Sequence, residues 1–148
     1  RANVAYFGTF GYELDLNKLS YEEISEVKQQ IAFMKEYREL IQFGTFYRLK
    51  SPFEGNETAW MTVSEDKKTA LVFWYRERNV VNADFTRVRL QGLDPDLIYR
   101  NEYNGTENYG DELMNLGLLT TDCTAGEPTS EDEPCTDYES RIYVLTAK

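Results

Sequence analysis

The stretch Thr69-Ala-Leu-Val-Phe-Trp-Tyr-Arg76 decides how the larger part of this 148-residue chain folds. From Leu71 to Tyr75 it contains only apolar and aromatic residues, with no alternation between polar and apolar positions. A strand of this kind is buried on both faces and lies inside a sheet. Other segments of the chain therefore have to supply a strand on each side of it.

Short segments with strand character follow Gly44, separated by turn-forming residues at intervals of about eight to twelve positions, as in a β-sandwich or barrel. Asn104-Gly105 predicts a hairpin turn between two of them. We expect a mainly-β fold, an antiparallel Greek-key-like sandwich of about seven to eight strands. Besides Thr69–Arg76, the predicted strands are Thr45–Leu49, Thr58–Val63, Phe85–Leu90, Leu97–Asn101, one beginning at Leu118-Leu119, and Ser140–Thr146, which closes the sheet.

One long amphipathic helix is predicted before the strands, from Ser20 to Gly44. Ser20 and Glu23 have the spacing of a capping box, in which each side chain accepts a hydrogen bond from the other residue's backbone amide. Gly44 stands where a left-handed residue ends many helices. The helix needs a large packing surface, because apolar residues recur along one face. They are Ile24, Val27, Ile31, Met34 and Ile41.

The run Phe7-Gly-Thr-Phe-Gly-Tyr-Glu-Leu-Asp15, entered through Val4 to Phe7, predicts a glycine-punctuated apolar strand. Such a strand needs neighbours, and the few residues before it cannot supply them. We therefore expect this chain to be a piece of a longer protein.

The charge distribution excludes several classes of function. The net charge is −10, from 26 acidic and 16 basic residues, which argues against a nucleic-acid partner. The chain has no histidine, so no Ser-His or Cys-His nucleophile system can be built from it. Its apolar runs are far shorter than the ~20 residues that cross a bilayer, so no membrane segment is predicted.

Much of the acidity lies in one insert, Thr120 to Tyr138, which contains both cysteines of the chain. Cys123 and Cys135 either form a disulfide, which would stabilise the fold by ~3 kcal/mol, or remain an incidental free pair. Carboxylate oxygens of the insert could bind Ca²⁺, but the insert lacks the regular spacing of a calcium loop. We therefore expect a solvated acidic loop and no cofactor or metal.

Glycoside hydrolysis requires two carboxylates that face a shared sugar. Glu13 and Asp15 are two positions apart on the predicted strand and would point to one face. The simpler interpretation is that both carboxylates are solvated, at the point where the strand ends and the chain leads into the helix. The pairs Asp94/Asp96 and Asp111/Glu112 are likewise expected to form turns.

Aromatic residues are numerous enough to form a platform for stacking on sugars. The candidates are Trp60, Trp74, Tyr47, Tyr75, Tyr99, Tyr103, Tyr109 and Tyr143. Trp60 and Trp74 lie within apolar strands, so a role in the core is the favoured interpretation for both.

A set of motifs occurs in an order that resembles the C-terminal part of the α-galactosidases of glycoside hydrolase family 36. The resemblance covers nearly the whole chain except the acidic insert. The motifs are Phe7–Asn17, Glu39–Leu49, Ser51-Pro-Phe53, Glu57–Trp60, Gly92-Leu-Asp-Pro95, Gly110–Asn115 and Arg141–Leu145.

The resemblance implies a parent enzyme with an N-terminal β domain, a (β/α)8 barrel and a C-terminal β-sandwich. Residues 1–43 would hold the last barrel strand and helix, and residues 44–148 the sandwich. Enzymes of this family retain configuration and use two aspartates on earlier barrel strands, and neither motif is in this chain. We therefore predict no catalytic, substrate-binding or metal residue here, although Gly8 to Gly11 would lie near the rim of the pocket.

The predicted function is that of an accessory region of an α-galactosidase, which removes terminal α-D-galactose from oligosaccharides such as melibiose and raffinose. Its main partner would be the barrel of the parent enzyme, and the isolated chain would be inactive and structural. Two alternatives remain open, a carbohydrate-binding module and an oligomerisation domain. The resemblance favours a cytoplasmic location, whereas the paired cysteines favour secretion.

Overall fold

The computed structural model describes residues 1–79, 85–120 and 137–148. These residues form two compact units, Arg1–Gly44 and Thr45–Lys148. No helix in the described part of the chain is long and apolar enough to cross a membrane.

The first unit is built on the long helix α2 (Tyr21–Phe43), whose N-terminus carries the predicted capping box. Ser20 Oγ accepts from the amide of Glu23 at 3.2 Å, and the Glu23 carboxylate accepts from the amide of Ser20 at 2.7 Å. The predicted helix is confirmed, but the predicted left-handed cap at Gly44 is wrong. Gly44 has φ −65° and ψ 160°, because an extended backbone leads directly from the helix into the strand that starts at Thr45.

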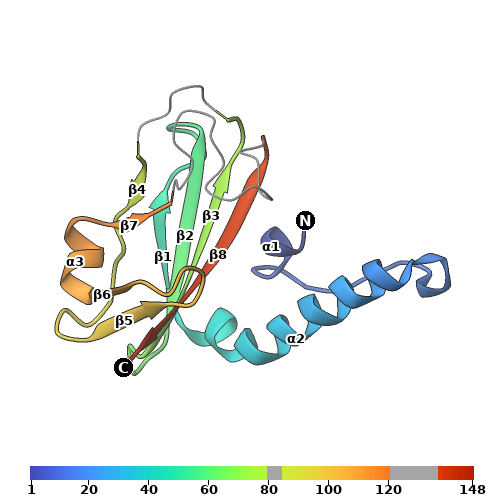
Figure 1. Ribbon diagram of the computed structural model, residues 1–148, viewed down its shortest axis with the longest axis horizontal. Coiled ribbons are helices and arrows are strands. Elements are labelled where there is room, and N and C mark those ends of the chain that lie inside the picture. The colour runs from blue at the N-terminus through green and yellow to red at the C-terminus, as the bar shows by residue number, and fades with distance from the viewer. Residues whose placement is uncertain (80–84, 121–136) are drawn as a thin grey trace. The chain divides into compact units, whose positions relative to one another are not determined.

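The segment Val4–Asp15, predicted to hold a strand and the loop after it, forms no strand in this structure. Residues 2–5 form the short helix α1 (Ala2–Ala5), and the chain then runs back along α2 to the 3₁₀ turn η1 (Leu16–Lys18), as Figure 1 shows. A lone apolar strand leaves its backbone N–H and C=O groups unpaired, and no strand within residues 1–44 pairs with this segment. Aromatic contacts order it instead: the ring of Tyr6 lies 4.8 Å from that of Phe10 and 4.9 Å from that of Phe33.

The second unit contains a six-stranded antiparallel sheet in the order β1-β2-β3-β8-β5-β6 and a two-stranded sheet of β4 and β7 (Figure 1). The strands of the large sheet are β1 (Thr45–Lys50), β2 (Glu57–Val63), β3 (Thr69–Arg76), β5 (Ile98–Asn101), β6 (Glu107–Tyr109) and β8 (Glu139–Ala147). The other elements are β4 (Arg87–Val88), β7 (Leu118–Leu119) and the helix α3 (Gly110–Asn115). The predicted antiparallel, mainly-β fold after one long helix is confirmed.

Strand β3 is central, as its sequence predicts. It pairs with β2 on one side and β8 on the other, and Leu71, Val72, Phe73 and Trp74 are each 0% exposed. Strand β8 does not close the sheet as predicted but lies inside it, between β3 and β5. Its own alternation explains this place, since Tyr143 and Leu145 are each only 1% exposed.

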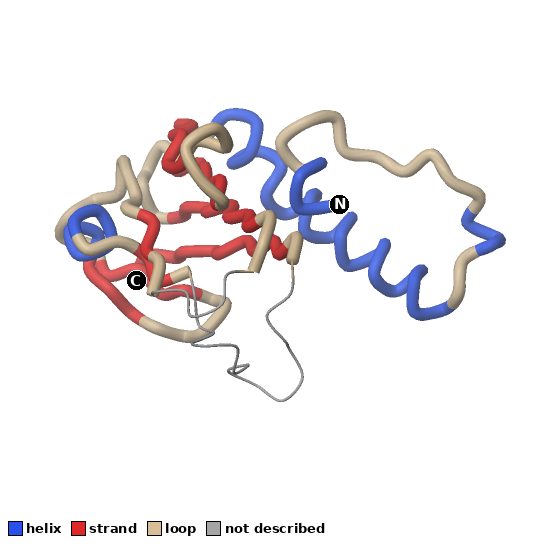
Figure 2. Tube along the Cα trace, turned by 90° about the horizontal axis from the view of Figure 1, so that it is seen from above, coloured by secondary structure: helices blue, strands red, loops and turns tan. Residues whose placement is uncertain are grey.

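The core lies on one face of the large sheet, and α3 with the β4–β7 pair forms the layer that covers it (Figure 2). Val88 and Leu90 face inward while Arg87 and Arg89 face solvent, as the alternation of this segment predicts. The covering layer is therefore a short ribbon and a helix rather than a second full sheet. Its contribution to the core is Val88, Leu90, Leu93, Leu113 and Leu118.

Helix α3 packs closely because its first residue is glycine. A Cβ on Gly110 would come within 1.9 Å of the carbonyl oxygen of Asp94, and the Gly110 amide donates to the Leu97 carbonyl at 2.9 Å. The turn at residues 94–97 thus lies against the start of α3 with no room for a side chain.

We expect Gly110→Ala to lower the free energy of unfolding by about 1–3 kcal/mol or more, because α3 has to move away from the backbone of Asp94. Urea denaturation of the chain measures this loss. Gly55→Ala is the matched control, since a Cβ there meets no atom within 4 Å, and its effect should stay within ~0.5 kcal/mol. Equal stabilities of the two variants would contradict the close packing described here.

Candidate functional site

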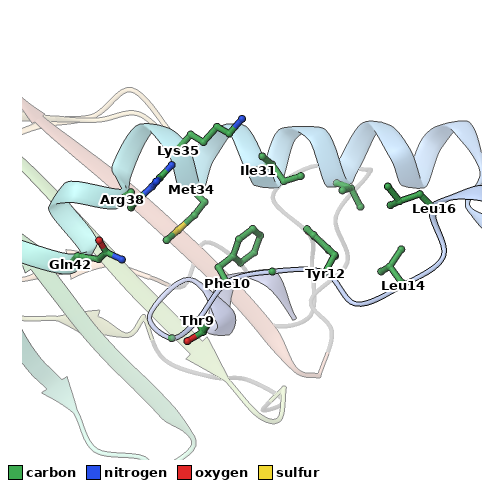
Figure 3. Close-up of a pocket in the computed structure, with 13 residues that line it drawn as sticks. Thr9, Phe10, Tyr12, Leu14, Leu16, Ile31, Met34, Lys35, Arg38 and Gln42 are labelled. Atoms are coloured by element: carbon green, nitrogen blue, oxygen red, sulfur yellow. The ribbon is translucent and has the colours of Figure 1, made fainter.

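A groove of about 630 Å³ lies in the first unit, between α2 and the segment that runs back along it. Figure 3 shows Phe10 and Met34 approaching each other from the two sides, with Tyr12 and Leu14 further along the segment. The groove is open because a single extended segment is too narrow to cover the apolar stripe of α2. No residue of α2 is fully buried, and the predicted stripe residues are half-buried: Ile24, Val27, Ile31, Met34 and Ile41.

The chemistry of the groove is apolar, with a cationic rim. Its polar groups come from α2, through Lys35, Arg38 and Gln42, and from the hydroxyls of Thr9 and Tyr12 on the segment. No aspartate or glutamate is among the described residues that line it. The Tyr12 hydroxyl donates to the Gln30 side chain and ties the segment to the helix. Without carboxylates the groove cannot perform acid–base or nucleophilic chemistry on a glycoside. It is suited to receiving apolar side chains.

The carboxylates considered from the sequence do not form a catalytic pair. Glu13 is exposed, and Asp15 accepts a hydrogen bond from the Asn17 amide at 3.1 Å as the cap of η1. Lys18 lies 3.9 Å from the other oxygen of Asp15. These contacts match the interpretation of a solvated segment that leads into the helix.

The acidic pairs of the second unit also have structural roles. Asp94 accepts from the amide of Asp96 at 3.1 Å and so closes its turn. Asp111 and Glu112 lie in the first turn of α3, where carboxylates interact favourably with the helix dipole. No group of three or more metal-ligating side chains occurs among the residues described in the structure.

The aromatic candidates divide between core and surface. Trp74, Tyr99 and Tyr143 are at most 1% exposed, so a platform built from them is excluded. The Tyr99 hydroxyl accepts from the Asp94 amide at 2.9 Å and donates to the Lys67 carbonyl at 2.7 Å. On the other face of the sheet, the Trp60 ring lies 4.8 Å from that of Tyr75.

Two of the predicted aromatic residues remain on the surface. Tyr103 is 45% exposed and Tyr109 is 52% exposed, near the β5–β6 hairpin. Tyr47 packs against the core from β1. The calcium and disulfide hypotheses, including Cys123 and Cys135, concern the insert and lie outside the described residues.

Sequence reasoning missed a cluster of polar and charged side chains at the end of the large sheet where β3 ends and β8 begins. Here the Glu57 carboxylate is bound by the Lys50 ammonium and by the Thr86 hydroxyl, the latter at 2.8 Å. Beside it, Glu139 forms salt bridges with Arg76 and Arg141. The only signal for this cluster in the sequence is that charged residues occupy core-facing positions of the strands. That signal can be recognised only once the strand register is known.

Comparison with known proteins finds a matching family for each of the two units. Residues 57–145 match the glycosyl hydrolase family 36 C-terminal domain, and residues 1–44 match the family described as melibiase. The chain belongs to glycosyl hydrolase family 36.

Family 36 relatives of the chain are named α-galactosidases. The chain is 52% identical over 118 residues to α-galactosidase AgaA of Geobacillus stearothermophilus, covering 80% of the chain and 16% of that protein. It is 44% identical over 147 residues to α-galactosidase 1 of Pediococcus pentosaceus, covering 99% of the chain and 19% of that protein. The chain thus spans less than a fifth of the length of these family 36 relatives.

Solved family 36 structures have the same fold. The crystal structure of AgaA from Geobacillus stearothermophilus matches with a TM-score of 0.86 at 44% identity, over 99% of the chain and 19% of that protein. The α-galactosidase from Lactobacillus brevis matches with a TM-score of 0.87 at 41% identity and the same coverage. A variant of AgaA has been solved in complex with raffinose.

Burial of Tyr75 predicts a measurable pH dependence of stability. Burial raises the pKa of Tyr75 above its ordinary value near 10, because the phenolate loses its hydration. The unfolded chain therefore releases this proton at a lower pH than the folded chain. The stability that the neutral phenol contributes is complete below pH 10 and is lost as the pH rises beyond it.

We expect the free energy of unfolding to fall less steeply above pH 10 in Tyr75→Phe than in the unsubstituted chain. Urea denaturation between pH 8 and about pH 11 tests this. Tyr21→Phe is the control, because Tyr21 is 90% exposed, and its pH profile should match that of the unsubstituted chain. Superimposable profiles for all three proteins would contradict the role of Tyr75.

Proposed function

We propose that this chain is the C-terminal accessory region of a retaining α-galactosidase, which releases terminal α-D-galactose from oligosaccharides such as melibiose and raffinose. The observation that carries the proposal is the pair of matches over both units, together with relatives that are named α-galactosidases. The complex of an AgaA variant with raffinose supports the substrate class.

Within that enzyme, residues 1–43 are proposed to be the last strand and helix of the (β/α)8 barrel, and residues 44–148 the sandwich domain. The geometry of the first unit supports this assignment. Its groove is apolar and the stripe on α2 is only half-buried, as expected for a helix that packs against further barrel elements. In the barrel the segment from Val4 to Asp15 would gain the strand neighbours that it lacks here.

The chain itself is proposed to be structural. The candidate carboxylates cap a helical turn, close a turn, lie in the first turn of α3 or are exposed, and the family's two catalytic aspartates belong to earlier barrel strands. Barrel enzymes place their catalytic residues on the ends of several different strands. One strand and one helix are therefore too little to assemble the site.

The chain alone should hydrolyse 4-nitrophenyl α-D-galactopyranoside no faster than buffer, because both catalytic carboxylates are missing. Release of nitrophenol, followed by absorbance, measures this. AgaA serves as the positive control, and a longer chain that includes the preceding barrel should be active. Turnover that copurifies with the 148-residue chain would overturn the structural role.

A carbohydrate-binding role is the alternative that a specific observation favours, namely the exposed rings of Tyr103 and Tyr109. Aromatic faces of this kind can stack on sugars. Calorimetric titration with raffinose separates the two functions: saturable binding that is lost in Tyr109→Ala would favour the alternative. An oligomerisation role would appear in sedimentation as a stable oligomer of the chain.

We also propose a cytoplasmic location for the parent enzyme, on the basis of its resemblance to bacterial members of the family. In that compartment Cys123 and Cys135 would be reduced. A thiol count on the denatured parent enzyme, isolated from its natural host under conditions that block thiol exchange, should then find both. A bridged pair would contradict this location.

A further inference from the structure

A small polar pocket lies at the turn between β1 and β2, in the second unit. It encloses about 290 Å³. Ligand pockets in proteins enclose about 300–1,000 Å³, so this one suits a ligand of the size of a single sugar ring. The pocket shares Lys50 and Glu57 with the cluster of polar and charged side chains at this end of the sheet.

An irregularity of β1 helps to gather charged groups at the pocket. The pairing of β1 with β2 shifts between Arg48 and Lys50, which marks a β-bulge. Bulges re-aim the side chains beside them and are frequent next to functional sites. Lys50 forms a salt bridge with Glu57 at the start of β2. The wall of the pocket therefore carries an ion pair whose two charges neutralise each other.

The turn that carries the pocket is held in one shape by its own hydrogen bonds. Ser51 Oγ accepts from the Phe53 amide at 3.3 Å, and the Glu54 amide donates to the Ser51 carbonyl at 3.3 Å. The side chain of Asn56 accepts from the Arg78 amide at 2.9 Å and donates to the Arg78 carbonyl at 2.5 Å. A turn that is ordered in advance loses little conformational entropy when a ligand binds.

The lining of the pocket favours an uncharged polar ligand. The exposed carboxylate of Glu54 repels anions, and the ammonium group of Lys50 repels cations. An apolar ligand would remove these charged groups from water without replacing their hydrogen bonds. The lining contains donors, in Lys50 and Ser51, and acceptors, in Glu54 and Glu57. Sugar hydroxyls fit both kinds of group, because a hydroxyl donates and accepts.

An aromatic ring projects from the same turn. Phe53 stands between the lining residues Ser51 and Glu54 and is 95% exposed. Stacking on the apolar face of a sugar ring would remove part of this exposed surface from water. A sugar therefore matches the polar pocket through its hydroxyls and the Phe53 ring through its C–H face.

A glycine in the wall leaves the pocket open. A Cβ on Gly55 would meet no atom within 4 Å, and its φ lies outside the left-handed region. Neither close packing nor the local backbone thus requires a glycine at this position. Glycine also serves where a ligand approaches the backbone closely, and that need remains at Gly55.

We propose that the pocket at the β1–β2 turn binds one sugar ring of an oligosaccharide, apart from the active site of the parent enzyme. Lys50, Glu54 and Glu57 form hydrogen bonds with the hydroxyls of the sugar, and its C–H face stacks on Phe53. The choice of an oligosaccharide as the ligand rests on the proposed function, whereas the preference for a polyhydroxylated ring rests on the pocket itself.

Raffinose is the probe, because it carries galactose, glucose and fructose rings in one molecule. We titrate the 148-residue chain with it and follow the backbone amides by NMR spectroscopy. Residues 49–57 should show saturable shifts with a Kd on the order of 1 mM, since a small open pocket buries little of the ligand. Acetate and ethylammonium, titrated separately, should give no saturable shift there, because Glu54 repels the first and Lys50 the second.

Two variants test the two parts of the site. Gly55→Leu should abolish the saturable shifts, because its side chain takes the space of the ligand, and urea denaturation checks that it folds. Phe53→Ala should raise the Kd about three-fold or more, the effect of losing one stacking contact. Its fold should be kept, since the ring is 95% exposed. Tyr109→Ala is the matched control at an exposed aromatic residue outside the pocket, and it should leave the Kd unchanged.

Each outcome decides the proposal. Absence of saturable shifts at residues 49–57 overturns it, and so does raffinose binding that Phe53→Ala and Gly55→Leu leave unchanged. Binding that Tyr109→Ala abolishes assigns the sugar to the β5–β6 hairpin instead and overturns it as well. Saturable binding of acetate or ethylammonium in the pocket contradicts the preference for a sugar. Hydrolysis by the longer chain is measured separately, so failure of the pocket and failure of the proposed α-galactosidase function are told apart.

Discussion

The second unit depends on the pairing of β3 with β8. Strand β3 is buried on both faces, so both of its edges need hydrogen-bonded neighbours, and β8 supplies one of them from 63 positions further along the chain. This register brings Tyr143 and Leu145 into the core beside Val72 and Ala70. It also brings Arg141 and Glu139 beside Trp74 and Arg76. One pairing thus sets both the apolar core and the polar end of the sheet.

The first unit has a different physical basis. Helix α2 is stabilised locally, by its capping box and by the segment that runs back along it, and no residue of the helix is fully buried. A helix with half-buried apolar side chains and an apolar groove is suited to further packing partners. The chain spans less than a fifth of its family 36 relatives, so the proposed barrel would provide those partners. Because this chain holds only one strand and one helix of the proposed barrel, the proposed activity belongs to the parent enzyme rather than to this chain.

Several elements could be predicted because their signals are local. The capping box at Ser20, the continuous apolar run of β3 and the Asn104-Gly105 turn between β5 and β6 depend on neighbouring residues, and all three occur as expected. Residues Val4–Asp15 form no strand here, because strand formation needs partners that the local sequence does not contain. The prediction that β8 closes the sheet was wrong, because a strand's neighbours depend on chain topology, which the alternation of its residues does not encode.

The sequence by itself determined the family, the mainly-β class, the long capped helix and the absence of histidine-based chemistry, since these follow from residue identity and short-range spacing. Only the tertiary structure decided the strand order, the burial of Tyr99 and Tyr143, and the gathering of Arg76, Glu139 and Arg141 near the Trp74 ring. The reason is that the pairing register of the strands brings together residues that are far apart in the sequence. A buried charge cluster exists only after two strands far apart in sequence have been placed side by side.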